Sequence, residues 1–294
     1  MKYLINIYTL FLRVVSMPAF LAEYLHPNTG KEYGVNSWAK IVLLWRMIRN
    51  KKKISTASDF LEHITMATRI LNIPVSVEGC VVECGCYKGG STANLSLVCQ
   101  LCHRSLEVFD SFAGLPEPSP DDRLHAAMDR DKVDVYTKGA YCGTLDEVKK
   151  NLSRFGALST CQFHVGYFEE TLPKFQNPCV FIFLDVDLRA SLETCVKHLW
   201  PLLKEGNCLF THEAQQMEMA SLFFDQRWWQ ENLNDDPPGL VGAGCGIGLL
   251  PRSGAYKSCL GYAAKNLKAK VVVQLLDKNI ASSSVHGEAD SLKT

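Results

Sequence analysis

One stretch of ten residues constrains the fold more than any other, namely residues 82–91, VECGCYKGGS. It follows a short apolar run and precedes a segment with helical spacing, so it predicts a strand, a glycine-rich turn and the start of a helix. Glycine lacks a Cβ and lets the backbone approach a ligand closely, and the first N–H groups of the helix point to the same place. Many α/β proteins have such a turn, so the order of the later elements decides its meaning.

Further apolar runs follow at the spacing of an α/β sheet, and segments with helical periodicity separate them. Two β-like runs near the end of the chain flank the turn signal PRSG at residues 251–254, which predicts an antiparallel hairpin. We therefore expect an α/β fold with a seven-stranded, mostly parallel sheet that closes with a C-terminal hairpin. The runs are residues 80–82, 106–109, 161–165, 180–184, 207–211, 246–250 and 256–263.

The chain divides into three parts. Residues 1–72 are expected to form a helical extension, whose last helix spans residues 56–71 with Thr56 and Asp59 as its capping pair. Residues 73–278 form the main domain, and residues 279–294 a disordered tail. Within the main domain, residues 111–143 are rich in Pro, Asp and Gly, and so long an irregular segment is typical of a lid over a site.

Composition excludes one class of partner and suggests a compartment. Lys plus Arg and Asp plus Glu both number 31 in 294 residues, and this balance argues against a nucleic-acid binder. The closest cysteine pairs lack zinc-finger spacing. Six of the 12 cysteines fall in or beside apolar runs, namely Cys80, Cys84, Cys161, Cys179, Cys208 and Cys259. Reduced, buried cysteines are typical of a reducing compartment, so we expect a cytoplasmic protein.

The first residues are apolar but do not read as a membrane span. Arg13 and Pro18 interrupt residues 3–25, whereas a span requires about 20 consecutive apolar residues. We expect an amphipathic helix that packs on the domain or on a second copy in a homo-oligomer, and peripheral membrane contact stays open as an alternative. The basic run that follows is expected to be a solvated helix end; it comprises Arg46, Arg49, Lys51, Lys52 and Lys53.

Acidic residues end several predicted strands. In an open parallel sheet the ligand lies beyond the carboxyl ends of the strands, so these positions indicate the site. Asp110 ends the second strand, where a carboxylate can accept hydrogen bonds from ribose hydroxyls. A nicotinamide dinucleotide would require Gly-x-Gly-x-x-Gly, which residues 85–90 do not supply. The strand-end positions are Glu83, Asp110, Gly166, Asp185 and the pair His212-Glu213.

Five motifs occur in a specific order between residues 73 and 265. They are VECGCYKGGS (82–91), FDSFAGLP (109–116), GTLDEV (143–148), VGYFEETLP (165–173) and LDVDL (184–188). In these motifs the chain resembles the macrocin O-methyltransferase-like enzymes, a family of class I S-adenosylmethionine-dependent methyltransferases. The resemblance implies a Rossmann-like fold and methyl transfer from S-adenosylmethionine to a hydroxyl of a small molecule, such as a sugar of a glycosylated natural product.

The resemblance also implies which residues hold the cofactor. The methionine part is expected at the glycine turn, the ribose at the second strand and the adenine after the third predicted strand. The implied residues are Glu83, Gly85, Tyr87, Lys88, Gly89, Gly90 and Ser91 for the methionine part, Asp110 and Ser111 for the ribose, Gly166, Tyr167 and Phe168 for the adenine, and Asp185 beside them.

The implied metal site is where the sequence departs from the family. The family binds a divalent cation, usually magnesium, with an Asp that ends one strand and an Asp-Asp pair that ends the next. Here Asp185 and Asp187 match the first position, but His212-Glu213 replaces the pair. Imidazole suits zinc, iron or manganese better than magnesium, so a metal at Asp185, His212 and Glu213 would be a changed one.

Three interpretations of this departure stay open. The enzyme could use a different metal, or it could work without a metal and use His212 as a general base for the acceptor hydroxyl. The third is loss of catalysis, which would leave a cofactor-binding or scaffold protein. In the first two interpretations the catalytic residues are Asp185, Asp187 and His212, and the lid contributes to acceptor binding.

Overall fold

The computed structural model describes residues 21–126, 133–247 and 258–266, together with positions 7, 8, 11, 15 and 18. Within these residues, six strands form one sheet in the order β5-β2-β1-β6-β7-β8, in which β8 is antiparallel to β7 and the other neighbours are parallel. A separate antiparallel hairpin pairs two short strands. The sheet strands are β1 (Cys80–Cys84), β2 (Leu106–Asp110), β5 (Cys161–Val165), β6 (Cys179–Leu184), β7 (Leu203–Thr211) and β8 (Gly261–Ala264), and the hairpin strands are β3 (Leu124–Ala126) and β4 (Val133–Val135).

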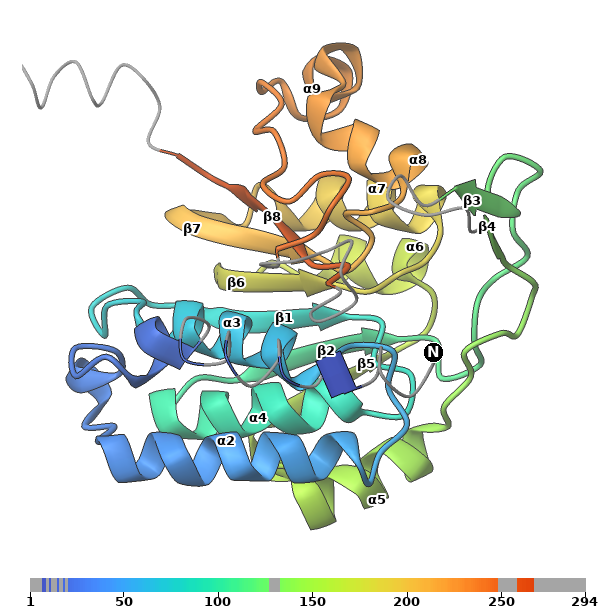
Figure 1. The fold of residues 1–294 in the computed structure, drawn as a ribbon. Coiled ribbons are helices and arrows are strands. Elements are labelled where there is room, and N and C mark those ends of the chain that lie inside the picture. Colours follow the sequence, from blue (N-terminus) through green and yellow to red (C-terminus); the bar gives the residue numbers. More distant parts are fainter. Residues whose placement is uncertain are drawn as a thin grey trace, which may run out of the picture.

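Helices cover both faces of the sheet (Figure 1). One layer holds α2 (Ser37–Lys51), α3 (Phe60–Leu71), α4 (Gly90–Cys102) and α5 (Leu145–Phe155), and the other holds α6 (Phe168–Thr171), α7 (Arg189–Leu199), α8 (Met217–Ala220) and α9 (Gln226–Leu233). Short 3-10 turns join them, namely η1 (Lys31–Tyr33), η2 (Leu158–Thr160), η3 (Leu172–Lys174) and η4 (Ser221–Phe224).

The strands divide their side chains between two cores. In β6, Phe181 and Phe183 pack toward the layer of α4, whereas Ile182 and Leu184 pack toward the layer of α7. This alternation follows from the period of two in a strand. Because both faces are covered, every residue of β6 is buried, and for this reason the strand reads as a continuous apolar run in the sequence.

The helices before the sheet share its core. Met47 of α2 and Ile64 of α3 belong to the same buried cluster as Val81 of β1. Helix α3 begins at Phe60 and not at Thr56, so the predicted capping pair was wrong. Asp59 is the N-cap, and Glu62 returns a hydrogen bond to the Asp59 backbone N–H to complete a capping box.

The C-terminal region differs from the predicted hairpin. β8 provides one antiparallel strand, so the sheet within the described residues has six strands and not seven. Val241 forms an isolated β-bridge with Tyr262, and the Ile247 N–H donates a hydrogen bond to the Leu260 carbonyl. The segment that holds Val241 and Ile247 therefore runs beside β8 but does not form a strand of its own. Residues 248–250 of the predicted strand and the predicted tail 279–294 lie outside the described residues.

Three other features complete the description of the fold. The segment that follows β7 forms three short helices, α8, η4 and α9. All 12 cysteines lie in described residues, and none forms a disulfide bond. Among the described residues, none of the helices combines the length and the apolar character that a membrane crossing requires.

Candidate active site

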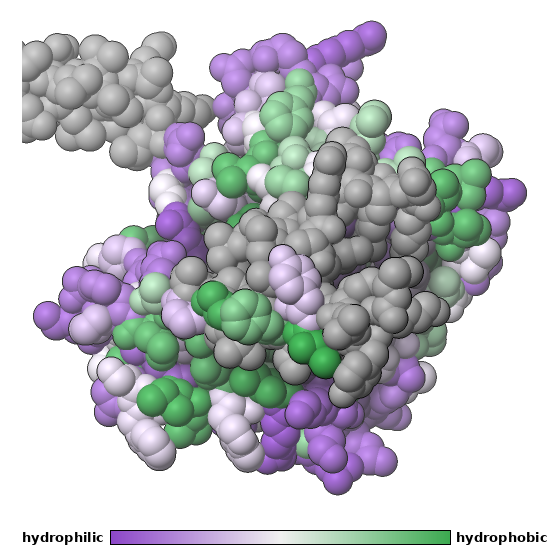
Figure 2. All heavy atoms as spheres, in the orientation of Figure 1, coloured by the Kyte–Doolittle hydropathy of each residue, from purple (hydrophilic) through white to green (hydrophobic). Residues whose placement is uncertain are grey.

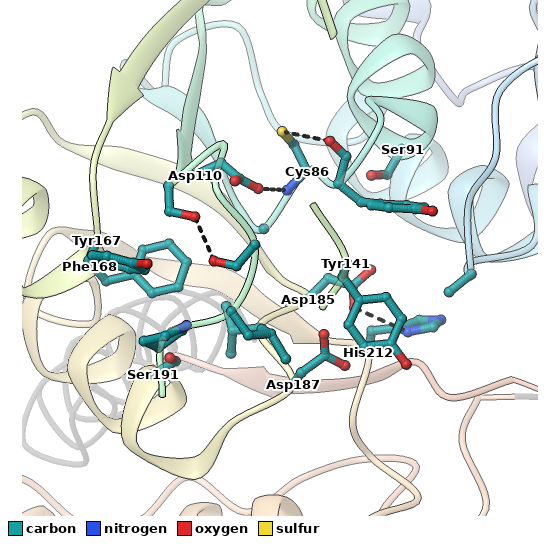
Figure 3. A pocket seen from close by; sticks show the side chains of 18 of the residues that line it. Cys86, Ser91, Asp110, Tyr141, Tyr167, Phe168, Asp185, Asp187, Ser191 and His212 are labelled. Carbon is teal, nitrogen blue, oxygen red and sulfur yellow. Dashed lines mark hydrogen bonds and ion pairs between the residues drawn. The ribbon is translucent and has the colours of Figure 1, made fainter. Parts of the chain in front are cut away.

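A cavity of about 350 Å³ opens at the carboxyl ends of β1, β2 and β6. In Figure 3, Asp110, Tyr167 and Phe168 lie on one side of it, and Tyr141, Asp185, Asp187 and His212 lie on the other. Ten of the residues predicted from the sequence line this cavity, which are Gly85, Tyr87, Ser91, Asp110, Ser111, Tyr167, Phe168, Asp185, Asp187 and His212.

The glycine turn has the shape that the sequence predicts. Gly85 has a φ of 83°, and a Cβ at this position would overlap the carbonyl oxygen of Asp185. Gly89 has a φ of 81° and is the N-cap of α4. Only glycine fits both demands at Gly85, since the left-handed conformation and the close approach to β6 each exclude a side chain.

Glu83 is a buried carboxylate without a cationic partner among the described residues. Its side chain is fully buried, and neither oxygen accepts a well-formed hydrogen bond from the protein. Burial raises the pKa of Glu83 to about 8, although the nearby hydroxyls of Ser91 and Thr92 favour the ionised form. A buried charge that the protein leaves unpaired is costly, so Glu83 is suited to a cationic ligand group.

Asp110 fixes the turn from a neighbouring strand. One carboxylate oxygen accepts a hydrogen bond from the Cys86 N–H at 2.7 Å, and the other accepts one from the Phe112 N–H at 2.7 Å. A carboxylate has about four acceptor sites, so two remain for a ligand. Ser111 lies next to it, and its hydroxyl donates to the Gly114 carbonyl at 2.8 Å within the loop.

Other predicted cofactor residues lie around the cavity without lining it. Gly166 donates a backbone hydrogen bond to the Asp110 carbonyl at 3.1 Å and leads into Tyr167 and Phe168. Lys88 points elsewhere, because its ammonium group lies 3.3 Å from the Glu147 carboxylate of α5. The predicted residues outside the cavity wall are Glu83, Lys88, Gly89, Gly90, Gly166 and Glu213.

His212 lies between two carboxylates from distant parts of the chain. Its Nδ1 is 3.4 Å from an Asp185 oxygen, and its Nε2 is 3.2 Å from a Glu62 oxygen. Glu62 is the capping-box residue of α3, and its second oxygen accepts hydrogen bonds from the Ser258 hydroxyl at 2.8 Å and the Cys259 N–H at 2.9 Å. Both ring nitrogens of His212 are therefore engaged.

The pKa shifts of His212 and Glu62 show which charges these two groups carry. Burial alone would lower the pKa of His212, but Asp185 and Glu62 outweigh burial and hold that pKa well above its usual value. Burial alone would raise the pKa of Glu62, but His212 and the backbone of Asp59 bring it to about 2. At neutral pH His212 is thus an imidazolium beside the ionised carboxylate of Glu62.

Glu213 does not line the cavity, and its carboxylate binds protein groups behind the cavity wall. One oxygen accepts hydrogen bonds from the Val186 N–H at 2.6 Å and the Asp187 N–H at 3.1 Å, and the other bonds to the Thr211 hydroxyl. The structure therefore does not assemble the predicted metal site of Asp185, His212 and Glu213, and no cluster of metal-ligating side chains occurs among the described residues. The reason is that the would-be donors are already bound to protein groups.

Asp187 lines the cavity, as do Tyr87 and Tyr141. Burial raises the pKa of Asp187 well above its usual value, and the charges of Asp185 and Glu213 act in the same direction. The rings of Tyr87 and Tyr141 meet edge to face at 6.2 Å, and both line the cavity. Asp187 has a φ of 61°, so it holds an uncommon backbone conformation in the loop that follows β6.

Part of the predicted lid, residues 111–143, lines the cavity, and another part of it is bonded to helix α7. Gly114, Leu115, Pro116 and Tyr141 line the cavity. Between them, the Asp122 carboxylate accepts a hydrogen bond from the Arg189 N–H at 2.6 Å at the start of α7.

Sequence reasoning missed Glu62 and Tyr141. A capping box placed at Asp59 would have indicated Glu62, because the N3 acid of such a box returns to the N-cap. Nothing in the sequence indicated Tyr141, which lies on an irregular loop.

The fold and the position of the cavity define a class of protein. A mostly parallel sheet with an antiparallel last strand, and a cavity beyond its carboxyl ends, is the class I methyltransferase architecture that the sequence predicted. The family model for macrocin O-methyltransferase matches residues 56–236, which is more than half of the chain. The chain therefore belongs to the macrocin O-methyltransferase family.

The chain is similar to several solved methyltransferase structures, and the one with a TM-score above 0.5 shows the same fold. The O-methyltransferase NovP is 18% identical, with a TM-score of 0.54 over 76% of this chain and 88% of that chain. The calicheamicin methyltransferase CalS11 is 13% identical, with a TM-score of 0.49 over 76% of this chain and 92% of that one. An O-methyltransferase from Bacillus cereus in complex with SAH is 14% identical, with a TM-score of 0.41 over 76% and 91%. No curated protein sequence matches the chain.

Proposed function

We propose that this protein is an S-adenosylmethionine-dependent O-methyltransferase that acts on a hydroxyl of a small, sugar-like molecule. The observation that carries this proposal is the single cavity that brings the glycine turn and Asp110 together with Asp185, Asp187 and His212. The alternative of a scaffold without catalysis is not favoured, because the family match over residues 56–236 includes the glycine turn and all four of these side chains.

Residues in the cavity wall, together with Glu83 of the adjoining strand β1, fit the cofactor. Glu83 is a buried carboxylate that lacks a cationic partner, and S-adenosylmethionine carries an ammonium group. Asp110 keeps acceptor capacity for ribose hydroxyls, and the rings of Tyr167 and Phe168 offer an apolar surface for adenine. When bound, this cofactor supplies an electrophilic methyl group on a sulfonium centre.

The cavity wall also suits an uncharged acceptor. Among the described residues that line the cavity, none is Lys or Arg, whereas Asp187 and Glu169 are acidic. The imidazolium of His212 is already paired with Asp185 and Glu62, so a phosphorylated acceptor would meet no unpaired positive charge among these residues. Tyr87 and Tyr141 present ring surfaces and hydroxyls, which suits a polyhydroxylated ring.

Asp187 is the group we assign to the acceptor proton. His212 has no free ring nitrogen, because Asp185 and Glu62 engage both. Asp187 lies in the cavity wall, and a carboxylate whose pKa burial has raised is a better proton acceptor near neutral pH. The donors of the predicted metal site do not fit a divalent cation, so no step is assigned to a metal.

Calorimetry tests the cofactor assignment. We expect heat of binding with S-adenosylmethionine and S-adenosylhomocysteine and none with NAD. Absence of heat with both sulfur compounds would overturn the assignment.

A second experiment tests the acceptor and the proton acceptor. Labelled methyl transfer to a panel of neutral sugars and glycosides, each paired with its phosphorylated form, should label the neutral members. Asp187→Asn should then reduce turnover by about 10²- to 10⁴-fold with little change in cofactor affinity, as expected for loss of a general base. Preference for the phosphorylated members, or normal turnover in Asp187→Asn, would contradict this assignment.

A further inference from the structure

Helix α2 is apolar on two sides. Its inner side packs Leu43 and Met47 into the core. Its outer side exposes Trp38 by 70% and Trp45 by 59%, with Ile41 and Val42 between them exposed by 47% and 40%. Residues seven apart lie on one side of a helix, so these four side chains form one stripe. A surface helix usually keeps its outer side polar, which makes two exposed tryptophans unusual.

A basic cluster continues this stripe at the C-terminal end of the helix. Arg49, Lys52 and Lys53 are exposed, and none forms an ion pair within the part of the chain that the structure describes. The guanidinium groups of Arg49 and Arg154 both lie over the Phe155 ring, at 5.5 and 5.6 Å, so α5 adds a further positive charge. Residues 37–53 contain no acidic residue.

The two features lie on one side of the molecule. Figure 2 shows green and pale surface gathered over α2 at the lower left of the view, with purple surface to its right. Lys51, in contrast, faces inward, because its ammonium group donates to the Ser58 carbonyl. The exposed positive charges are thus concentrated at one end of the apolar stripe.

We propose that α2 is a docking surface for an anionic lipid membrane. Tryptophan favours the boundary between headgroups and acyl chains, and Lys and Arg beside it attract lipid phosphates. A second copy of this chain fits the surface less well. Docking α2 against α2 would bring together helices that carry basic residues and no acidic ones.

The docking surface leads directly to the active site. The chain that leaves the basic cluster at Lys53 reaches Ser55, Thr56 and Ala57, and these three residues line the cavity. This inference does not rest on the proposed function, because membrane binding is measured without an acceptor or a cofactor.

Vesicle sedimentation tests the proposal with the full chain. The protein should sediment with vesicles that contain phosphatidylglycerol, far less with pure phosphatidylcholine, and less as salt increases. The triple variant Arg49→Gln, Lys52→Gln, Lys53→Gln should lose affinity on the order of a hundredfold, at about fivefold for each charge. The double variant Trp38→Ser, Trp45→Ser should also lose binding.

Matched controls come from the opposite side of the molecule. Phe224 of η4 is exposed by 57%, and Phe224→Ser should leave vesicle binding unchanged. Lys197→Gln with Lys204→Gln should do the same for charge. Cofactor binding and circular dichroism report whether each variant is folded.

Two results would overturn the proposal. One is absence of sedimentation with anionic vesicles, or sedimentation that both α2 variants retain. The other is a dimer in light scattering that the tryptophan variant converts to a monomer, which would identify the stripe as an interface between copies of this chain.

Discussion

At the scale of single residues, the buried environment of Glu83 is the feature that most strongly indicates a cationic ligand group. Its carboxylate is buried and has no cationic partner within the described part of the chain, so its ionisation is costly. We predict that Glu83→Gln lowers affinity for S-adenosylmethionine about 10- to 100-fold, the amount expected for one charged hydrogen bond. The same change should raise the melting temperature of the ligand-free protein at pH 8. Calorimetry and thermal unfolding measure the two effects.

The pH dependence of this effect has a definite sign. The pKa of Glu83 is about 8 in the folded protein and 4.5 in the unfolded chain, so ionisation of Glu83 favours the unfolded state. The resulting loss in the free energy of unfolding grows as pH rises from 4.5 to 8. The stability advantage of Glu83→Gln should therefore vanish near pH 4. Glu107→Gln is the control, since the Glu107 carboxylate is also buried but lies 2.8 Å from His164. Equal loss of cofactor affinity in both variants would contradict a specific role for Glu83.

His212 stabilises the fold through its two carboxylate partners. His212→Ala leaves Glu62 buried without its cation, so we predict a loss of about 3–5 kcal/mol in the free energy of unfolding at pH 7. Adding Glu62→Gln to His212→Ala should restore part of this loss. Urea unfolding measures both variants.

The ion pair of His212 and Glu62 stabilises the fold over a limited range of pH. The lowered pKa of Glu62 gives stability that is present above about 4.5 and is lost as pH falls toward 2. The raised pKa of His212 gives stability that is present in acid and is lost only as pH rises well above neutral. Wild type and His212→Ala should therefore differ most between these limits, and a difference that stays constant at all pH values would argue against the pair.

At the scale of elements, the approach of β1 to β6 depends on Gly85. A Cβ there would overlap the Asp185 carbonyl, and the φ of 83° adds strain. Gly85→Ala should cost more than about 3 kcal/mol, since overlap adds to the roughly 1–2 kcal/mol that a left-handed residue costs. It should also abolish cofactor binding. Chemical unfolding and calorimetry test these outcomes.

Gly206 provides the matched comparison for Gly85. Its φ is 77°, but a Cβ there meets nothing within 4 Å. Gly206→Ala should thus cost only about 1–2 kcal/mol and leave cofactor binding intact. If the two variants lose the same stability, close packing at β6 is not what requires glycine at position 85.

At the scale of the whole molecule, the helices before the sheet belong to the core. Asn50 of α2 donates to the Asn94 side chain of α4 at 2.9 Å and to the Phe155 carbonyl at 3.1 Å. We predict that the chain unfolds in one transition, with coincident curves from circular dichroism and fluorescence. A fragment that begins at residue 73 should fail to fold. Two separate transitions, or a folded fragment, would show that the extension is independent.

The sequence by itself determined the order of elements and the location of the site. Continuous apolar runs predicted the parallel strands because both faces of the sheet are buried, as β6 illustrates. Acids at strand ends predicted the edge at which Asp110, Asp185 and Asp187 meet, since carboxyl ends of parallel strands share an edge. These features depend on local periodicity and on the chain order of the motifs, which a sequence displays directly.

Only the tertiary structure decided what His212 and Glu213 do. Glu62 reaches His212 across 150 residues of sequence, and Glu213 turns to backbone N–H groups of the strand end beside it. The direction of a side chain at a strand end depends on which donors the neighbouring elements present there, and no local pattern encodes that. The sequence therefore located the residues that line the cavity, whereas packing determined that two predicted metal ligands serve the protein's own hydrogen bonds and ion pairs.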